Sequence, residues 1–187
     1  HEYTFSYITS LKTVIIEDGV GEIGEAAFDG CTSLVNVTIP QSVNTIKSYA
    51  FQGCNSLVNV KLPDSITSIE YGTFKECISL VSIDIPNSVT NIGDYAFHWC
   101  YELSSVDMSD VLVSIGKEAF GECKKLRDIT LPDTLTSIGY YAFGNCESLV
   151  SIKIPDLITN IPDSAFSGCY SLANVVLPET LKEIGRY

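Results

Sequence analysis

The stretch of sequence that decides the fold is residues 34–56, which read LVNVTIPQSVNTIKSYAFQGCNS. The same pattern, with the consensus L-x-x-V-x-I-P-x-x-V-x-x-I-G-x-x-A-F-x-G-C-x-S, returns every 23 residues without an insertion. Self-similarity at a fixed period of this length is the signature of a repeat protein. The repeats begin at Leu11, Leu34, Leu57, Leu80, Leu103, Leu126, Leu149 and Leu172.

Two columns of this pattern predict a continuous core. All eight phenylalanines fall in one column (Phe5, Phe28, Phe51, Phe74, Phe97, Phe120, Phe143 and Phe166), and all seven cysteines fall three positions later (Cys31, Cys54, Cys77, Cys100, Cys123, Cys146 and Cys169). A single repeat of this length cannot cover its own apolar face, so neighbouring repeats must stack. We therefore expect equivalent residues to lie over one another and to form one apolar spine.

Each repeat divides into short elements. Alternating apolar and small polar residues at 36–39 predict a brief strand, which Pro40 ends because proline has no N–H for the ladder. Residues 43–46 predict a second extended or turn segment. The A-F-x-G-C spacing at residues 50–54 predicts a single helical or 3₁₀ turn. The fold class predicted is an α/β repeat solenoid with short parallel strands and short helical or 3₁₀ turns.

A glycine column follows the second isoleucine of the repeat. It holds Gly24, Gly93, Gly116, Gly139 and Gly185, but Lys47, Glu70 and Pro162 in other repeats. The proline ring fixes φ at a negative value, so this column does not require a positive φ.

The motifs L-x-x-V-x-I-P, I-G and A-F-x-G-C, repeated every 23 residues, resemble the BspA-like leucine-rich repeats over residues 4–187. The resemblance implies a right-handed solenoid and, in many members, secreted or cell-surface adhesins that bind matrix or other proteins. The chain departs from the motif where Glu76, Trp99, Glu122 and Asn145 replace the glycine before cysteine. We expect residues 1–187 to form one solenoid. Because the chain begins and ends part way through a repeat, we also expect it to be a fragment of a longer array.

Composition argues against several partners. The formal net charge is −12, so the averaged field repels phosphate backbones, and no concentrated basic patch offsets it. A small basic group, Lys117, Lys124, Lys125 and Arg127, is more typical of a solvated face than of a local site. No run approaches the roughly 18 apolar residues that a membrane helix needs. We expect no nucleic-acid partner, no direct membrane insertion and no cofactor.

The residues also give little support for catalysis or metal binding. The two histidines are His1 and His98, and neither lies in a recognisable nucleophile motif. Cys100 follows His98 closely but belongs to the core column. Cysteines of one column point in parallel directions, which suits neither a disulfide torsion nor the converging ligands of a zinc site. We expect no enzyme, no catalytic residue, no metal site and a buried ladder of small apolar thiols.

An acidic column follows the proline that ends the first strand. Its members are Asp18, Asp64, Asp110, Asp133, Asp156 and Glu179, interrupted by Gln41 and Asn87. Calcium or a basic partner would explain stacked carboxylates. Asp and Asn also suit turns because they bond to nearby backbone N–H groups, and we prefer this second interpretation.

Two surfaces are candidates for partner binding. The outward positions of the first strand predict a concave ladder of Asn36, Thr38, Asn59, Lys61, Ser82, Asp84, Ser105, Asp107, Asp128, Thr130, Ser151 and Lys153. We prefer this ladder as the binding surface, although small polar side chains on a strand are also typical of an ordinary solvated face. The tyrosines Tyr49, Tyr95 and Tyr141 share one column, and Tyr71 and Tyr140 share the adjacent one. Exposed tyrosine is typical of interfaces, although a tyrosine ring also packs along a ridge with its hydroxyl in water.

These observations together favour a protein-binding module at the cell surface or outside the cell, adhesin-like, that recognises a host or matrix protein. The alternative is a structural stalk that holds another domain and has no ligand of its own.

Overall fold

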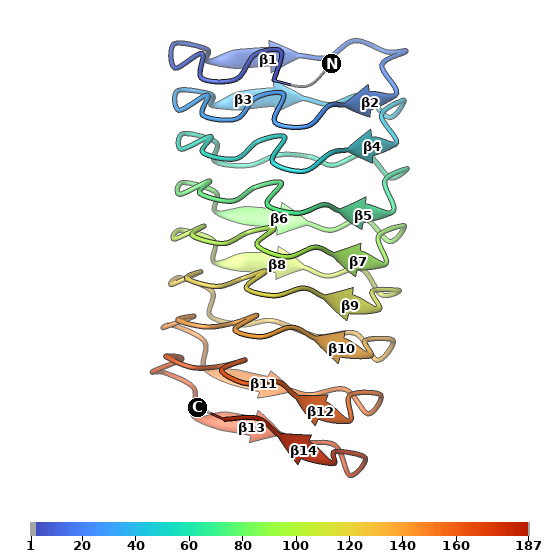
Figure 1. Ribbon diagram of the computed structural model, residues 1–187, viewed down its shortest axis with the longest axis vertical. Helices are drawn as coiled ribbons and strands as arrows, with labels where there is room; N and C mark the ends of the chain where they lie inside the picture. Colours follow the sequence, from blue (N-terminus) through green and yellow to red (C-terminus); the bar gives the residue numbers. More distant parts are fainter. Residues whose placement is uncertain (1–2, 187) are drawn as a thin grey trace.

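The computed structural model describes residues 3–186 and is a stack of similar coils (Figure 1). The two ends of the chain lie at opposite ends of the stack. Every pair of strands is parallel and joins equivalent residues of successive repeats, as in Val14 with Val37 and Ile23 with Ile46. The spacing of the sequence pattern is therefore the length of one coil, and equivalent residues lie directly over one another as predicted.

Strands form two series along each coil (Figure 1). The first series contains three-residue strands, in which one side chain points inward and its two neighbours outward: β1 (Thr13–Ile15), β3 (Asn36–Thr38), β6 (Ser82–Asp84), β8 (Ser105–Asp107), β11 (Ser151–Lys153) and β13 (Asn174–Val176). The second series contains two-residue strands: β2 (Glu22–Ile23), β4 (Thr45–Ile46), β5 (Ser68–Ile69), β7 (Asn91–Ile92), β9 (Ser114–Ile115), β10 (Ser137–Ile138), β12 (Asn160–Ile161) and β14 (Glu183–Ile184).

The two series differ in how many successive coils their strands join by pairing. The second series contains a four-stranded sheet in the order β10-β9-β7-β5, flanked by the pairs β2-β4 and β12-β14. The first series pairs only two by two, as β1-β3, β6-β8 and β11-β13. Residues 59–61 and 128–130 occupy the same place in their coils without forming strands, and Asp128 makes only an isolated bridge to Ser151. The first face is therefore the more open of the two.

The prediction of a single helical or 3₁₀ turn in each repeat is wrong. Residues 3–186 contain no helix, and the A-F-x-G-C segment is instead a chain of overlapping turns. The physical reason is backbone handedness, because the second residue before each phenylalanine and the residue before each cysteine have a positive φ, as in Tyr49 (60°) and Gly53 (65°). A left-handed residue interrupts a right-handed helix. The fold is a parallel β-solenoid and not an α/β structure.

The left-handed residues direct every second N–H of this segment toward the next coil. The N–H of Phe51 donates to the Thr73 carbonyl (3.0 Å) and that of Gly53 to the Lys75 carbonyl (2.8 Å), whereas that of Cys54 closes a turn on Phe51 (3.2 Å). The same alternation recurs in the coils above and below. The turns thus form a third hydrogen-bonded ladder along the stack.

The phenylalanines form a single file through the core. Successive rings are nearly parallel, with centroids from 5.2 Å apart (Phe97 and Phe120) to 5.6 Å apart (Phe51 and Phe74). Phe51, Phe74, Phe97, Phe120 and Phe143 are completely buried. This file is the apolar spine that the sequence predicted.

The prediction that the glycine column does not need a positive φ is confirmed. None of Gly93, Gly116 and Gly139 has one. These glycines instead make room for the preceding coil, because a Cβ on Gly116 would lie 2.6 Å from the carbonyl carbon of Gly93.

A first prediction concerns the spine. Replacing Phe97 with alanine should lower the free energy of unfolding by about 3–5 kcal/mol, because the cavity is enclosed by coils on both sides. Phe5 is 46% exposed at the end of the file, so Phe5→Ala should lower the free energy of unfolding by less than half of that amount. Chemical denaturation of the two variants measures the difference, and equal losses would contradict a continuous core.

A second prediction concerns the glycine column. Gly139→Ala should destabilise the fold by about 1–3 kcal/mol, because its new methyl group would collide with the backbone of Gly116 and Lys117. Gly21→Ala is the matched control, since no atom lies within 4 Å of its Cβ position. Thermal unfolding should separate the two, and a neutral Gly139→Ala would disprove the packing explanation.

Candidate functional site

The outward residues of the first strand series form one face, called here the first-strand face. Asn36, Thr38, Asn59, Lys61, Asp84, Ser105, Asp107, Asp128, Thr130, Ser151 and Lys153 are exposed, and Ser82 is half-buried. The residue between the two members of an outward pair is buried, as at Ile83 and Val106, except that Val37 is half-buried. The structure therefore brings these candidate residues to one side of the stack.

Two shallow grooves lie on this face where the pairing is interrupted. One, of about 640 Å³, is lined by residues that include Thr130, Asp133 and Lys153. The other, of about 220 Å³, includes Asp107 and Asp128. Both grooves open beside the isolated bridge, where the first strand series is not continuous.

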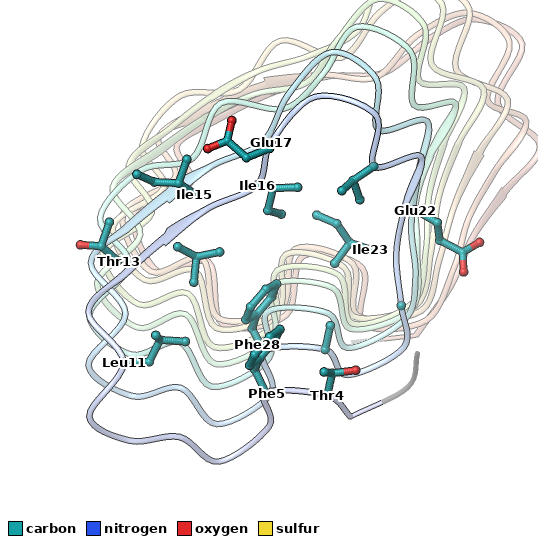
Figure 2. Close-up of a pocket in the computed structure, with 14 residues that line it drawn as sticks. Thr4, Phe5, Leu11, Thr13, Ile15, Ile16, Glu17, Glu22, Ile23 and Phe28 are labelled. Carbon is teal, nitrogen blue, oxygen red and sulfur yellow. The ribbon is translucent and has the colours of Figure 1, made fainter.

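A further hollow, of about 480 Å³, lies at the first coil (Figure 2). Figure 2 shows Phe5 and Phe28 there, with Leu11, Ile16 and Ile23 around them. These columns are buried in the inner coils. The hollow is the apolar interior of the coil seen end-on, so we do not regard it as a ligand site.

The tyrosines gather on the third face, which the turns form. We define the turn ridge as Tyr49, Tyr71, Tyr95, Trp99, Tyr140 and Tyr141. The ring of Tyr71 lies 5.1 Å from that of Tyr49 and 5.3 Å from that of Tyr95. Tyr71, Trp99 and Tyr140 are 39%, 36% and 46% exposed. The ridge is therefore a row of aromatic rings that water reaches.

Local backbone explains the position of these rings. Tyr49, Tyr95 and Tyr141 are all left-handed, with φ of 60°, 58° and 53°. The next coil after Tyr49 has Gly72 in this column, and a Cβ there would lie 2.8 Å from the Tyr49 ring. The tyrosine therefore leans over a neighbour that has no side chain.

Lysines and glutamates complete the ridge. The Lys117 ammonium lies 5.2 Å from the ring centre of Tyr95, 5.8 Å from that of Tyr140 and 3.6 Å from Oε1 of Glu118. The Lys75 ammonium lies 5.2 Å from the Trp99 ring centre. Lys117 thus connects the row around Tyr95 to the pair Tyr140 and Tyr141, whose rings are 6.0 Å apart.

Two partly buried carboxylates accept hydrogen bonds from the ridge. The Tyr95 hydroxyl donates to Glu118 (3.2 Å), and the Tyr141 hydroxyl (3.5 Å) and Asn145 amide (2.6 Å) donate to Glu122. The side chains of both glutamates are 19% exposed. Burial, reinforced by Glu122 and Glu118, raises the pKa of Tyr141 to about 12.

His98 lies beneath this ridge. Its ring packs 5.5 Å from Tyr95 and 4.5 Å from Trp99, and it is 5% exposed. Its Nδ1 has no hydrogen-bond partner and is 3.7 Å from Oε2 of Glu118. Burial lowers the pKa of His98, although Glu118 and Glu122 act in the opposite direction. The neutral ring is thus a support for Trp99.

The Cys100 thiol takes no part in a pair with His98. It lies in the core and donates to the carbonyl of Phe74 (3.2 Å). The other six cysteines do the same with the phenylalanine 26 positions earlier, at 3.1–3.3 Å. The seven thiols are free, as expected, and six of them are buried. Sequence reasoning treated them as apolar and missed their role as donors.

The acidic column is divided into two halves. Oxygens of Gln41 and Asn87 accept the backbone N–H of Asp64 and Asp110 in the next coil, both at 2.9 Å. Side chains of this column therefore do bond to backbone N–H groups, as expected. The acceptors are the amide side chains and not the carboxylates, and the N–H groups belong to the next coil. From residue 110 onward the column holds carboxylates alone. Within residues 3–186 no three His, Cys, Asp or Glu side chains are grouped as a metal site would require.

The three faces and the shared core define a leucine-rich repeat solenoid. Proteins of this class generally act through protein interactions or as structural elements. Residues 1–110 and 90–187 match the family model described as BspA type leucine rich repeat region, in six copies. The chain belongs to this family. No curated protein sequence matches the chain.

Two solved structures are similar. A leucine rich repeat protein of T. pallidum is 29% identical, with a TM-score of 0.76, and the match covers 96% of this chain and 76% of that one. A leucine rich cell surface protein of Faecalibacterium prausnitzii A2-165 is 27% identical, with a TM-score of 0.50, and the match covers 89% of this chain and 60% of that one. Residues 3–186 contain no helix with the length and apolarity of a membrane span.

A third prediction follows from the thiol ladder. Burial raises the pKa of Cys77, Cys100 and Cys123 above the ordinary value of 9.0 and that of Cys169 to about 11. Below pH 9 the thiols are protonated in both the folded and the unfolded chain. Above pH 9 the thiols of the unfolded chain lose their protons, whereas those of the folded chain keep them. The free energy of unfolding should therefore fall as pH rises.

Denaturant titrations between about pH 8 and about pH 10.5 measure this fall. The double variant Cys100→Ala, Cys123→Ala is the control, since it lacks two of the groups and should show a shallower dependence. Identical slopes for the two proteins would mean that the buried thiols do not cause the effect.

Proposed function

We propose that this chain is a protein-recognition module, secreted or displayed at the cell surface, that binds a host or matrix protein in the manner of an adhesin. The solved structure of a leucine rich cell surface protein with 27% identity supports the location. Two surfaces are available, the first-strand face and the turn ridge. We place the main contact on the turn ridge and a supporting contact on the first-strand face.

The observation that carries this proposal is the row of large aromatic rings that left-handed residues present on the ridge. Tyr95 and Trp99 have φ of 58° and 63°, a region that disfavours large L residues. The same columns are left-handed in all the other coils, with glycine at Gly72 and Gly53 but with other residues at positions such as Ser164 and Glu76. The left-handed backbone is thus common to the coils, and what distinguishes Tyr95 and Trp99 is the large aromatic ring that each of them carries there.

The chemistry of the ridge also suits a protein partner. Tyrosine and tryptophan dominate the binding energy of protein interfaces because they bury large rigid surfaces. The rings are held by contacts with one another and with His98, so little side-chain entropy is lost when a partner binds. The stack beneath them repeats at one spacing, which preorganises the whole row.

The fourth prediction tests this placement. Binding to a panel of purified extracellular matrix proteins should be weakened about tenfold or more by Tyr95→Ala with Trp99→Gly, because these remove two interface anchors. Both changes use residues that the same columns hold in other coils, such as Ala26 and Gly53, so the fold is retained. Surface plasmon resonance gives the dissociation constants.

Asp84→Asn with Asp107→Asn is the matched pair on the first-strand face, and its effect should be smaller. Loss of binding in this pair alone would move the contact to the first-strand face. Failure of the unaltered chain to bind any protein of the panel would favour a stalk without its own ligand.

A further inference from the structure

A histidine beneath the turn ridge is buried with an unsatisfied ring nitrogen. His98 is 5% exposed, and its Nδ1 makes no hydrogen bond. A neutral imidazole has one nitrogen that donates and one that accepts, and a buried polar atom without a partner costs free energy. Native proteins contain few such atoms, and each one needs a physical explanation. A second state of the ring, in which Nδ1 has a partner, would explain this one.

The carboxylate of Glu118, from the next coil, faces this nitrogen. Its Oε2 lies 3.7 Å from Nδ1, whereas its Oε1 accepts the Tyr95 hydroxyl at 3.2 Å and lies 3.6 Å from the Lys117 ammonium. An N–H···O hydrogen bond is usually no longer than about 3.2 Å, so the two groups must approach by at least about 0.5 Å before Nδ1 can donate. The two oxygens of Glu118 thus face different groups, one on the ridge and one beneath it.

The next coil leaves room for this approach. Gly121 occupies the column of His98 in that coil. A Cβ on Gly121 would lie 2.7 Å from Nδ1 of His98 and 3.4 Å from the backbone carbonyl oxygen of Glu118. A side chain at position 121 would therefore press on the ring at Nδ1. Because the residue is glycine, this side of the ring is clear and the ring can move toward the next coil.

The charges around the ring determine how readily it takes up a proton. Burial lowers the pKa of His98 below the ordinary value of 6.5. Glu118 and Glu122 of the next coil favour the charged ring, whereas Lys75 of the preceding coil opposes it. Lys75 is itself paired with Glu76 at 3.4 Å. The ring is therefore neutral near pH 7 and becomes charged in mild acid.

A movement of His98 reaches the surface through the two aromatic rings that pack on it. The ring centre of Trp99 lies 4.5 Å from that of His98, and the ring centre of Tyr95 lies 5.5 Å away. A charged His98 that is drawn toward Glu118 withdraws its packing from Trp99. It also competes with the Tyr95 hydroxyl for the same carboxylate. Proton uptake by one buried group therefore changes two rings of the ridge.

We propose that His98 is a pH-sensitive switch of the turn ridge. In neutral solution the uncharged ring packs beneath Trp99. In mild acid the ring takes up one proton from the solvent, Nδ1 donates to Oε2 of Glu118, and Trp99 loses its packing and becomes more accessible to water. The switch belongs to the free chain and does not depend on which partner the ridge binds, so its test needs no partner.

The fluorescence of the whole chain reports on this switch, because Trp99 is its only tryptophan. Acrylamide quenches an indole in proportion to its accessibility. Quenching of Trp99 should be stronger at about pH 5 than at about pH 7.5, and the midpoint of the change should lie below 6.5, where this histidine titrates. Equal quenching at the two pH values would overturn the proposal.

Two variants identify the groups responsible. His98→Gln is the matched control, because Gln52 occupies the same column two coils earlier and His1 and all the glutamates are retained. Its Trp99 should be quenched equally at both pH values, and a transition as large as that of the unaltered chain would overturn the proposal. Glu118→Gln removes the carboxylate that favours the charged ring, so the midpoint should move to lower pH by roughly one unit. An unchanged midpoint would also overturn it.

Discussion

Hydrogen bonding from one coil to the next is the interaction on which the rest of this structure depends. Each coil offers backbone donors and acceptors along two strand series and along the turns, and their partners lie in the neighbouring coils. No coil satisfies these groups alone, and an unpaired buried amide is costly. The same bonds hold the strained residues of the ridge, since a left-handed non-glycine residue costs about 1–2 kcal/mol. The N–H groups of Tyr95 and Trp99 are bonded to carbonyls of the next coil, at 2.8 Å and 3.0 Å, and relaxation of the backbone would break these bonds.

The repeat period was enough to predict which residues point inward and which point outward. The Phe97 ring is buried and Asp84 is exposed, as the column pattern requires. The turns were not predictable in the same way. The A-F-x-G-C spacing fits a single helical turn as well as it fits residues that alternate between right-handed and left-handed backbone conformations. The glycine before cysteine was the signal for a left-handed residue, and its replacement by Glu76 and Trp99 concealed it.

The sequence predicted which residues share a face of the candidate site, but not which of their side chains touch. A column pattern places Tyr49, Tyr95 and Tyr141 on one face, but it does not show contacts between columns. Tyr71 joins Tyr49 to Tyr95, and Lys117 joins Tyr95 to Tyr140, only because these side chains lean across neighbouring columns. The donor role of the thiols was missed for the same reason, because their acceptors are phenylalanine carbonyls of the preceding coil.

Charge is arranged so that long-range and short-range interactions act at different places. The outward carboxylates of the acidic column, Asp110, Asp133, Asp156 and Glu179, follow one another without a lysine among them. On the ridge, by contrast, Lys75 and Lys117 each lie over an aromatic ring and near a glutamate. In the proposed function, the excess negative charge would attract a basic partner from a distance, and salt would screen this attraction. The contacts on the ridge, where lysines are paired with glutamates, would depend less on salt, so ionic strength should alter the rate of association more than the rate of dissociation.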